Sequence, residues 1–372
     1  VDLIESAERP VILAGHGVLM SGAMQELQLY ADKTQTPVAM TQLGLGALPA
    51  SHPMSLNMMG MHGEAYTNQA IQDADLLLAF GMRFDDRVTG NLRNYAPGAR
   101  KIHIDIDPSE VHKNVNVDVP LIGDLKTVLT DLIPMVDEYD HDEWLAQIAE
   151  WRRESNERDI VFWPQDDKLY TAKVINDIWK ETAGDAIVAT GVGQHQMWAA
   201  QYYRLEQPYR LITSGGAGTM GFGLPSGIGA WFAHPDRDIW VIDGDGSFQM
   251  TQAELSTAVN EGANVKIALM NNHFLGMVRQ WQEFFFESRY AGTPLKNPDF
   301  TLIAEAHGIP AKRITNPDEI SGAIQFARET PGPVVLEFKV EQEEAVYPMV
   351  PSGAALHEMI RRPNRSTLAS GE

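Results

Sequence analysis

Short apolar runs alternate with helical segments along the first third of the chain. The runs cover residues 11–14, 38–40, 76–80 and 102–106, and glycine, proline or aspartate bounds each of them. Continuous apolar runs of this length are typical of strands that are buried on both faces of a parallel sheet. The pattern over 22–33 predicts a crossover helix, which parallel strands require. This region therefore predicts an α/β domain.

The same alternation returns after residue 170. Here the predicted strands cover residues 186–189, 210–212, 239–242, 267–270 and 334–338. The predicted fold class is α/β, with two doubly wound, mainly parallel-sheet domains. A chain of 372 residues is also long enough for two domains of ordinary size.

The composition turns polar and acidic between the two series of strands. The acidic run 137–143 precedes a helical pattern that contains Trp144 and Trp151. We interpret this run as a solvated connector rather than a partner site. The predicted organisation is a first domain over 1–135, a linker with a helix over 136–168, and a second domain with a C-terminal tail over 169–372.

Charge and composition exclude several classes of protein. The formal net charge of -21 argues against a surface for nucleic acid or anionic membrane, because clustered Lys and Arg normally meet such partners. No apolar run approaches the roughly 20 residues of a membrane span. Without cysteine there is no disulfide, thiolate metal site or cysteine nucleophile. We expect a soluble, cytoplasmic protein. Because Val1 falls within an amphipathic helical pattern, we also expect a fragment of a longer gene product.

Candidate chemistry follows two neighbouring strands of the second sheet. The strand 239–242 leads into Asp243-Gly244-Asp245-Gly246-Ser247, and the strand 267–270 leads into Asn271-Asn272. Ligands of parallel sheets bind at the carboxyl ends of strands, so these side chains are expected at one rim. Asp245 and Asn272 offer the oxygen ligands that Mg²⁺ prefers, with space left for a diphosphate. Gly244 and Gly246 allow close backbone approach, and Ser247 opens a helix whose amides favour an anion.

Two glycine-rich loops follow other strands of this sheet. They cover residues 191–196 and 214–221. One such loop alone is an ordinary turn. Together with the turn at Gly244–Gly246, however, there are three at one rim, which favours a diphosphate cradle. The Gly-Asp-Gly turn with the later Asn-Asn pair resembles the signature of thiamine diphosphate enzymes.

A longer stretch points to one family within these enzymes. It is Phe274-Leu275-Gly276-Met277-Val278-Arg279-Gln280-Trp281-Gln282. This stretch, with 60–63, 84–90, 191–201 and 214–225, resembles the acetohydroxyacid synthase (acetolactate synthase) family, and the resemblance extends to about residue 360. It implies decarboxylation of pyruvate and condensation with a second pyruvate or 2-ketobutyrate, giving 2-acetolactate or 2-aceto-2-hydroxybutyrate. It also implies thiamine diphosphate, Mg²⁺ and FAD as cofactors.

The resemblance assigns roles around the thiamine diphosphate. The backbone carbonyl of Gly218 would meet the 4'-amino group, and Met220 would be the apolar support of the folded cofactor. The carbonyl of Phe274 would complete the magnesium shell with Asp245 and Asn272. The residues implied near the diphosphate are Gln194, His195, Gly244, Gly246, Ser247 and Phe248.

The resemblance also implies an acceptor site. Trp281 would form the wall that favours 2-ketobutyrate, and Arg87 would receive the acceptor carboxylate. A surface ion pair between Arg87 and Asp86 remains the alternative.

The first domain resembles the family's FAD-binding domain. A Gly-x-Gly turn alone supports only some nucleotide or none, and glycine is common in the family where His16 stands. The residues implied in FAD binding are Gly15, His16, Gly17, Gly60, Met61, His62, Gly63, Arg83, Asp85, Val88, Asp105, Ile106 and Asp124.

The resemblance does not include the family's N-terminal domain. It carries a glutamate that activates the thiamine pyrimidine, so we expect this chain to be inactive alone. The family implies a homodimer or homotetramer and a possible small regulatory subunit. Two alternatives are another enzyme with FAD and thiamine diphosphate, such as pyruvate oxidase or glyoxylate carboligase, and a non-catalytic cofactor-binding module.

Overall fold

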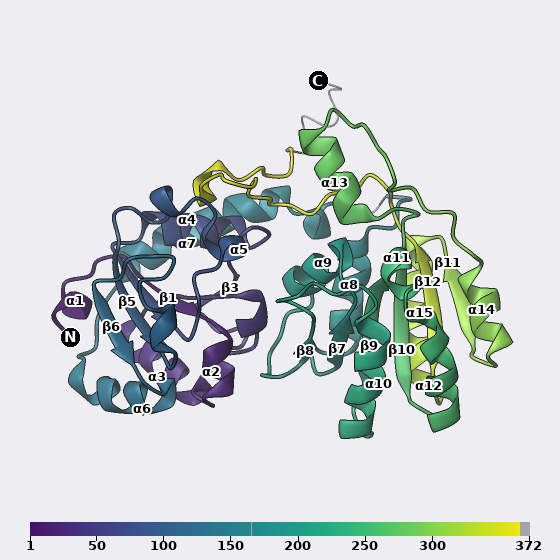
Figure 1. Cartoon of the computed structure of the whole chain (residues 1–372), viewed down its shortest axis with the longest axis horizontal. Coiled ribbons are helices and arrows are strands. Elements are labelled where there is room, and N and C mark those ends of the chain that lie inside the picture. The colour runs from purple at the N-terminus through teal and green to yellow at the C-terminus, as the bar shows by residue number, and fades with distance from the viewer. Residues whose placement is uncertain (165, 365–372) are drawn as a thin grey trace. The chain divides into compact units, whose positions relative to one another are not determined.

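The computed structural model describes residues 1–164 and 166–364, which form two compact units. Unit 1 comprises Val1–Phe162, Glu206–Pro208 and the C-terminal segment from Tyr347, and unit 2 comprises Trp163–Leu205 and Tyr209–Val346. Each unit contains a six-stranded sheet in which all paired strands are parallel (Figure 1). The predicted α/β class with two parallel sheets is confirmed.

The sheet of unit 1 has the strand order β3-β2-β1-β4-β5-β6. Its central strands β1 and β4 are completely buried, as their apolar runs predict. The strands are β1 (Pro10–Ala14), β2 (Val38–Met40), β3 (Ser55–Met58), β4 (Leu76–Phe80), β5 (Arg100–Asp105) and β6 (Val119–Ile122). The helices are α1 (Asp2–Glu5), α2 (His16–Met20), α3 (Met24–Thr34), α4 (Ala65–Asp73), α5 (Asp86–Thr89), α6 (Leu125–Leu132) and α7 (Asp142–Arg158).

Unit 1 includes two segments that we predicted to lie outside its domain. Helix α7, expected in a linker, packs on α4 and places Trp144 and Ile148 in the core. The segment from Tyr347, expected as a tail of the second domain, adds Val350 and Leu356 to the same core. Both differ from the predicted boundaries because their apolar side chains are buried in unit 1.

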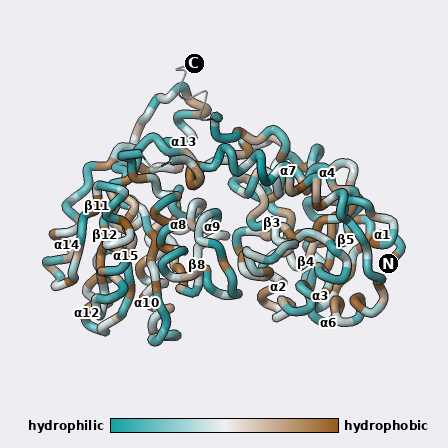
Figure 2. The backbone as a smooth tube through the Cα atoms, turned by 180° about the vertical axis from the view of Figure 1, so that it is seen from behind, coloured by the Kyte–Doolittle hydropathy of each residue, from teal (hydrophilic) through white to brown (hydrophobic). Residues whose placement is uncertain are grey.

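The sheet of unit 2 has the strand order β11-β12-β10-β9-β7-β8. The strands are β7 (Ile187–Thr190), β8 (Leu211–Ile212), β9 (Ile239–Gly244), β10 (Val265–Asn271), β11 (Ala311–Ile314) and β12 (Val334–Lys339). The helices are α8 (Thr171–Glu181), α9 (Gln194–Tyr202), α10 (Gly223–Ala233), α11 (Asp245–Phe248), α12 (Leu255–Glu261), α13 (Gly276–Phe285), α14 (Phe300–Ala306) and α15 (Ile320–Glu329). Hydrophobic stretches in both units appear as brown segments of the tube in Figure 2.

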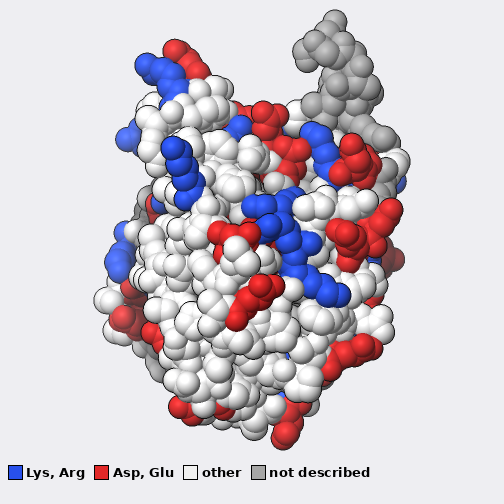
Figure 3. Space-filling model, turned by 90° about the vertical axis from the view of Figure 1, so that its right-hand side faces the viewer, with Lys and Arg blue, Asp and Glu red and all other residues white. Residues whose placement is uncertain are grey.

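The surface of the chain carries charges of both signs. On the face drawn in Figure 3, acidic and basic side chains lie next to one another. Among the described residues, no helix is long and apolar enough to cross a membrane.

Candidate cofactor site

A pocket opens in unit 2 at the point where the strand order reverses. The chain passes from β7 to β8 on one side of the sheet and from β9 to β10 on the other, so the loops after the neighbouring strands β7 and β9 separate at their carboxyl ends. The loops after β7, β9 and β10 all reach this point. The pocket is lined by Thr171, Val192, Gly193, Gln194, His195, Trp198, Met220, Gly244, Asp245, Gly246, Ser247, Met270, Asn272, Phe274, Leu275, Gly276 and Val340.

Asp245 is the acidic side chain of this lining. It follows β9 directly, begins the short helix α11, and is only 2% exposed. Its Oδ2 accepts a hydrogen bond of 2.6 Å from Nδ2 of Asn297. Burial raises the pKa of Asp245, although hydrogen bonds from Asn297 and two backbone amides act in the opposite direction. A buried carboxylate of this kind is stabilised as an anion by a cation in the pocket.

Asn272 and Phe274 stand in the turn after β10. Asn272 Oδ1 accepts from the backbone N–H of Phe274 at 3.0 Å, and its Nδ2 donates to Gln194 Oε1 at 3.4 Å. His273, between them, has a φ of 60°, a left-handed conformation that non-glycine residues rarely adopt. Asn272 and Phe274 of this turn line the same pocket as Asp245.

Glycine is required where two loops meet at the pocket. A Cβ at Gly244 would lie 2.7 Å from His195 Nδ1, and a Cβ at Gly276 would lie 2.1 Å from Gln194 Oε1. Side chains at these positions would displace the start of α9. Both glycines therefore keep the pocket wall compact.

Helix α9 contributes two predicted residues to the wall. Gln194 donates from Nε2 to Gln280 Oε1 at 2.9 Å, and so connects α9 to α13. His195 Nε2 lies 3.4 Å from Oδ1 of the fully buried Asp243. Ser247 Oγ accepts from the backbone N–H of Gly221 at 2.9 Å and fixes the end of the 214–221 loop.

Four predicted residues have positions that the motif alone did not specify. Met220 lines the pocket, whereas Gly218 lies in the exposed part of its loop with a φ of 65°. Phe248 packs its ring on Phe300 in the core, 5.8 Å between centroids, and is not among the residues that line the pocket. Trp281 is half-buried on α13, where its ring contacts Phe285.

Arg87 lines a second pocket, which lies within unit 1. Met61, Gly90 and the 350–353 segment complete this pocket. Arg87 also lies 3.5 Å from Asp86, and both side chains are mostly exposed. The ion pair that we considered as an alternative is therefore present at the mouth of a pocket.

The glycine turns of unit 1 have a packing role. A Cβ at Gly15 would lie 2.2 Å from the Gly81 carbonyl oxygen, and a Cβ at Gly17 would lie 2.6 Å from Gly81 Cα. Gly60 has a φ of 102°, and its N–H donates to Asn68 Oδ1 at 2.9 Å. Close contact between backbone segments is enough to require glycine at these positions.

The other residues predicted to bind FAD differ in how deeply they are buried. Asp105 ends β5, and its Oδ1 accepts from the N–H of Asp107 at 2.9 Å. Asp124 caps α6 by accepting from the N–H of Thr127 at 3.0 Å.

The rest of this group contains both exposed and buried side chains. Ile106 is 73% exposed, whereas Val88 lies in the core. Burial lowers the pKa of His62 to about 4. His16 bonds the carbonyl of Leu43, Arg83 lies 3.7 Å from Asp85, and Gly63 and Met61 follow Gly60 in one turn.

Sequence reasoning missed several contributors to the unit 2 pocket. Asn297 contacts Asp245 from a distant loop, and Gln280 joins α9 to α13. Thr171 lines the pocket from outside the glycine-rich loops, whereas Val192 and Trp198 lie within the 191–201 stretch but were not among the predicted site residues. The Asn-Pro-Asp sequence before α14 was the available signal for Asn297, because Asn and Asp before a helix mark a structured turn.

Comparison with known proteins agrees with this division of the chain. Residues 1–132 match the family described as the central domain of thiamine pyrophosphate enzymes. Residues 191–338 match its C-terminal TPP binding domain. The chain belongs to the thiamine pyrophosphate enzymes.

The relatives give a narrower placement. The chain is 44% identical over 370 residues to the acetolactate synthase large subunit of Corynebacterium glutamicum, covering 95% of this chain and 58% of that protein. It is 44% identical to an acetolactate synthase of Mycobacterium bovis, covering 96% of this chain and 59% of the relative. For a chloroplastic acetolactate synthase of Nicotiana tabacum the values are 43%, 97% and 55%. The chain thus carries two domains of the acetolactate synthase large-subunit family, and spans less than two thirds of these relatives.

Proposed function

We propose that this chain supplies the central and diphosphate-binding domains of an acetolactate synthase. The proposed reaction decarboxylates pyruvate and joins the remaining two-carbon unit to a second pyruvate or to 2-ketobutyrate. This is the first common step of branched-chain amino acid biosynthesis. The observation that carries the proposal is the convergence of Asp245, Asn272 and Phe274 on one pocket at the strand-order reversal.

The pocket fits a magnesium diphosphate. Among the described residues, no group of three or more His, Cys, Asp or Glu side chains could hold a metal alone. One carboxylate, one amide oxygen and one carbonyl leave coordination positions for phosphate oxygens and water, as Mg²⁺ prefers. We assign these ligands to Asp245, Asn272 and the carbonyl of Phe274. Gln194, His195, Gly244, Gly246 and Ser247 would surround the diphosphate.

Bound thiamine diphosphate would supply the electron sink for decarboxylation and carbon–carbon bond formation. The chain's own residues would bind and orient it. Met220 would support the folded cofactor from below, and the Gly218 carbonyl would accept a hydrogen bond from its amino group. Trp281 would form the apolar side of the acceptor site, and Arg87 would bind the acceptor carboxylate through its guanidinium fork.

We further propose that unit 1 binds FAD. The support is its match to the central domain and the strand-end carboxylate Asp105, which stands where adenosine hydroxyls commonly bind in such sheets. The packing of Gly15 and Gly17 on Gly81 removes them as independent support. We also propose a cytoplasmic homo-oligomer, with a possible small regulatory partner.

Turnover should need a group that these residues do not provide. Among the described residues, the pocket lining contains Asp245 as its only acid, and this carboxylate is assigned to the metal. No glutamate is therefore available there to activate the pyrimidine ring, and assistance of this kind is worth about 10²–10⁴-fold. We expect cofactor binding and catalysis to be separable.

The test measures binding and turnover on the same purified chain. Calorimetry should detect thiamine diphosphate in the presence of Mg²⁺, whereas acetolactate formation from pyruvate should be about 10²–10⁴-fold below that of a complete relative. Adding the N-terminal domain of the Corynebacterium glutamicum relative should restore activity. A folded chain that takes up no cofactor would contradict the assignment of the pocket, and uptake without restored acetolactate formation would contradict the reaction.

In the restored enzyme, Trp281→Leu should lower the preference for 2-ketobutyrate over pyruvate. Loss of an apolar wall beside one extra methylene changes selectivity by about 10–200-fold. A competition assay with both acceptors gives the ratio directly. An unchanged ratio would remove Trp281 from the acceptor site.

A further inference from the structure

We propose that Asn297 is a positioning residue for the magnesium site, and that the segment Thr293–Asn297 holds two of the three assigned ligands in place. This inference rests on the proposed function, because Asp245 and Phe274 are metal ligands only there. The segment lies outside the Gly-Asp-Gly and Asn-Asn motif. It is joined to the metal ligands by two independent sets of contacts.

The first set is formed by the Asn297 side chain. Its Nδ2 donates to Asp245 Oδ2 at 2.6 Å and to Asn271 Oδ1 at 2.9 Å. Its Oδ1 accepts from Gln249 Nε2 at 2.9 Å, so the amide cannot turn over without losing contacts on both sides. With Oδ2 engaged by Asn297, the carboxylate of Asp245 would present a single oxygen to a cation.

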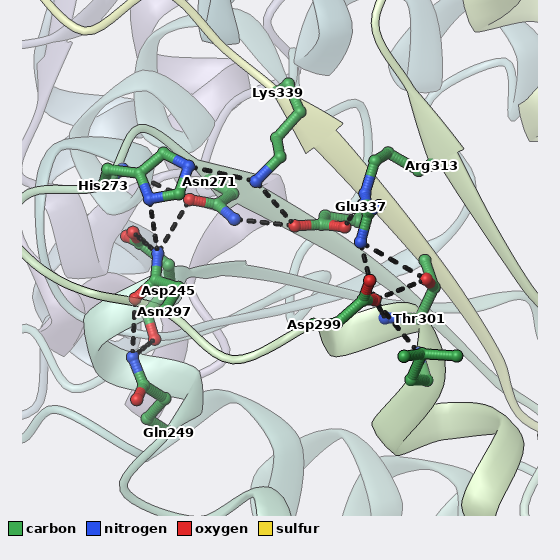
Figure 4. A network of polar contacts seen from close by, with 11 residues as sticks. Asp245, Gln249, Asn271, His273, Asn297, Asp299, Thr301, Arg313, Glu337 and Lys339 are labelled. Atoms are coloured by element: carbon green, nitrogen blue, oxygen red, sulfur yellow. Dashed lines mark hydrogen bonds and ion pairs between the residues drawn. The ribbon is translucent and has the colours of Figure 1, made fainter.

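The buried carboxylate of Glu337 determines the direction of these hydrogen bonds, because it can only accept (Figure 4). Glu337 is fully buried on β12, and its Oε1 accepts from Asn271 Nδ2 at 2.6 Å. Asn271 must therefore direct its Oδ1 to Asn297, which must direct its own Nδ2 to Asp245. A chain of donors and acceptors thus runs from Glu337 to the proposed ligand.

Two cations hold the buried anion. Arg313 Nε lies 2.6 Å from Glu337 Oε2, and Lys339 Nζ lies 3.0 Å from Oε1. Arg313 also pairs with Asp299 at 2.6 Å, two residues after Asn297. Asn297 and Asp299 thus both contact the network, so both ends of Asn297-Pro298-Asp299 are held in place.

The second set of contacts acts on the backbone of Phe274. The N–H of Leu275 donates to Thr293 O at 2.9 Å, and the N–H of Leu295 donates to His273 O at 2.7 Å. These bonds form an antiparallel bridge in which Phe274 faces Pro294. Phe274 and Pro294 form a non-hydrogen-bonded antiparallel pair, in which the N–H and C=O groups of the two facing residues point away from the partner segment. The bridge thus directs the Phe274 carbonyl away from Pro294.

The test compares three variants of the full chain by titrating Mg²⁺ in the presence of thiamine diphosphate. Asn297→Ala should weaken Mg²⁺ binding roughly 10–100-fold, as removal of outer-shell partners of metal ligands typically does. Gln249→Ala, which removes the hydrogen bonds to Asn297 Oδ1 and to the backbone carbonyl of Asp245 but leaves the Asp245 carboxylate paired with Asn297, should have a smaller effect in the same direction. Lys296→Ala is the matched control, because Lys296 is exposed in the same segment and should bind Mg²⁺ like wild type.

A second measurement does not depend on the cofactor. Crystal structures of the metal-free wild type and Asn297→Ala should show that the Asp245 carboxylate has rotated or occupies two positions in the variant. An unchanged Asp245 carboxylate with wild-type Mg²⁺ affinity in Asn297→Ala would overturn the proposal. If the wild-type chain takes up neither Mg²⁺ nor thiamine diphosphate, the proposed function fails, and the crystallographic comparison still decides whether Asn297 positions Asp245.

Discussion

The two sheets reverse their strand order in the same way but differ at the point of reversal. In unit 2 the loops beyond β7 and β9 separate around a pocket. In unit 1 the turn after β1 lies directly on the backbone after β4, where Gly15 and Gly17 contact Gly81. Shared topology therefore brings loops to one rim, but local packing decides whether space for a ligand remains between them.

The strongest test of this comparison removes the strand-end carboxylate of each unit in turn. Asp245→Ala should weaken binding of thiamine diphosphate with Mg²⁺ by more than about 100-fold, beyond the usual effect of outer-shell changes, because it removes a ligand. Uptake of FAD by unit 1 should not change. Asp105→Asn should do the reverse, with a loss of about tenfold for one hydrogen bond to a charged group. Calorimetry and flavin absorbance measure the two affinities, and loss of both cofactors in either variant would contradict independent sites.

A second test concerns the buried anion behind the unit 2 rim. Burial raises the pKa of Glu337, but hydrogen bonds from Arg313, Asn271 and Lys339 outweigh it, and the net pKa is lowered. The resulting stability is present above the ordinary Glu pKa of about 4.3 and is lost as pH falls through the lowered value. Glu337→Gln should cost up to about 3 kcal/mol at neutral pH, because it removes the anion that pairs with Lys339 and leaves Arg313 with Asp299 alone.

Urea unfolding at pH 7 and at about pH 3, below the ordinary Glu pKa, measures this effect. The variant should lose part of the wild-type acid sensitivity of unit 2. Asp118→Asn is the matched control in unit 1, since Asp118 pairs with Arg100 at 2.5 Å but both side chains reach solvent. Exposed pairs contribute about 1 kcal/mol or less, so an equal loss in both variants would argue against a special role of the buried network.

The smallest expected effects come from the glycines at the two points of reversal. A Cβ at Gly191 would lie 1.7 Å from Asp243 Oδ1, and one at Gly15 would lie 2.2 Å from the Gly81 oxygen. Gly191→Ala and Gly15→Ala should each destabilise their own unit by about 1–3 kcal/mol, the usual cost of overpacking. Gly216→Ala and Gly98→Ala are controls, because a Cβ there meets nothing within 4 Å. A stable Gly15→Ala variant that loses only FAD would restore the cofactor role of this turn.

The sequence predicted the central strands and missed strands at the sheet edges. The missed strands are β3, β6 and β11, which stand at the ends of their sheets. Strand β6 alternates half-buried and exposed positions, and β11 exposes Lys312 and Arg313. Edge strands need not be apolar on both faces, and charges protect them from pairing with other chains. A search for continuous apolar runs therefore detects the interior of a parallel sheet better than its margins.

The same limit applies to the cofactor site. The residues that were predicted in the pocket lie in contiguous motifs, such as Gly244-Asp245-Gly246 and the turn around Asn272. Asn297 reaches Asp245 through a single side chain from outside these motifs, so no local spacing indicates it, and Gln280 lies within the 274–282 stretch but its contact with Gln194 appears only in the fold. Phe248 lies within the motif but turns its ring into the core. Adjacency in sequence identifies a site, whereas side-chain direction requires the fold.

The return of the chain to unit 1 has a consequence for its synthesis. All six strands of that sheet leave the ribosome before unit 2 does, yet Val350, Leu356 and Met359 of its core leave after unit 2. At about 5–20 residues per second, the nascent sheet waits many seconds for these side chains. During that interval the apolar surface that they later cover is open to water and to chaperones. The unit whose sheet is made before unit 2 is therefore completed after it.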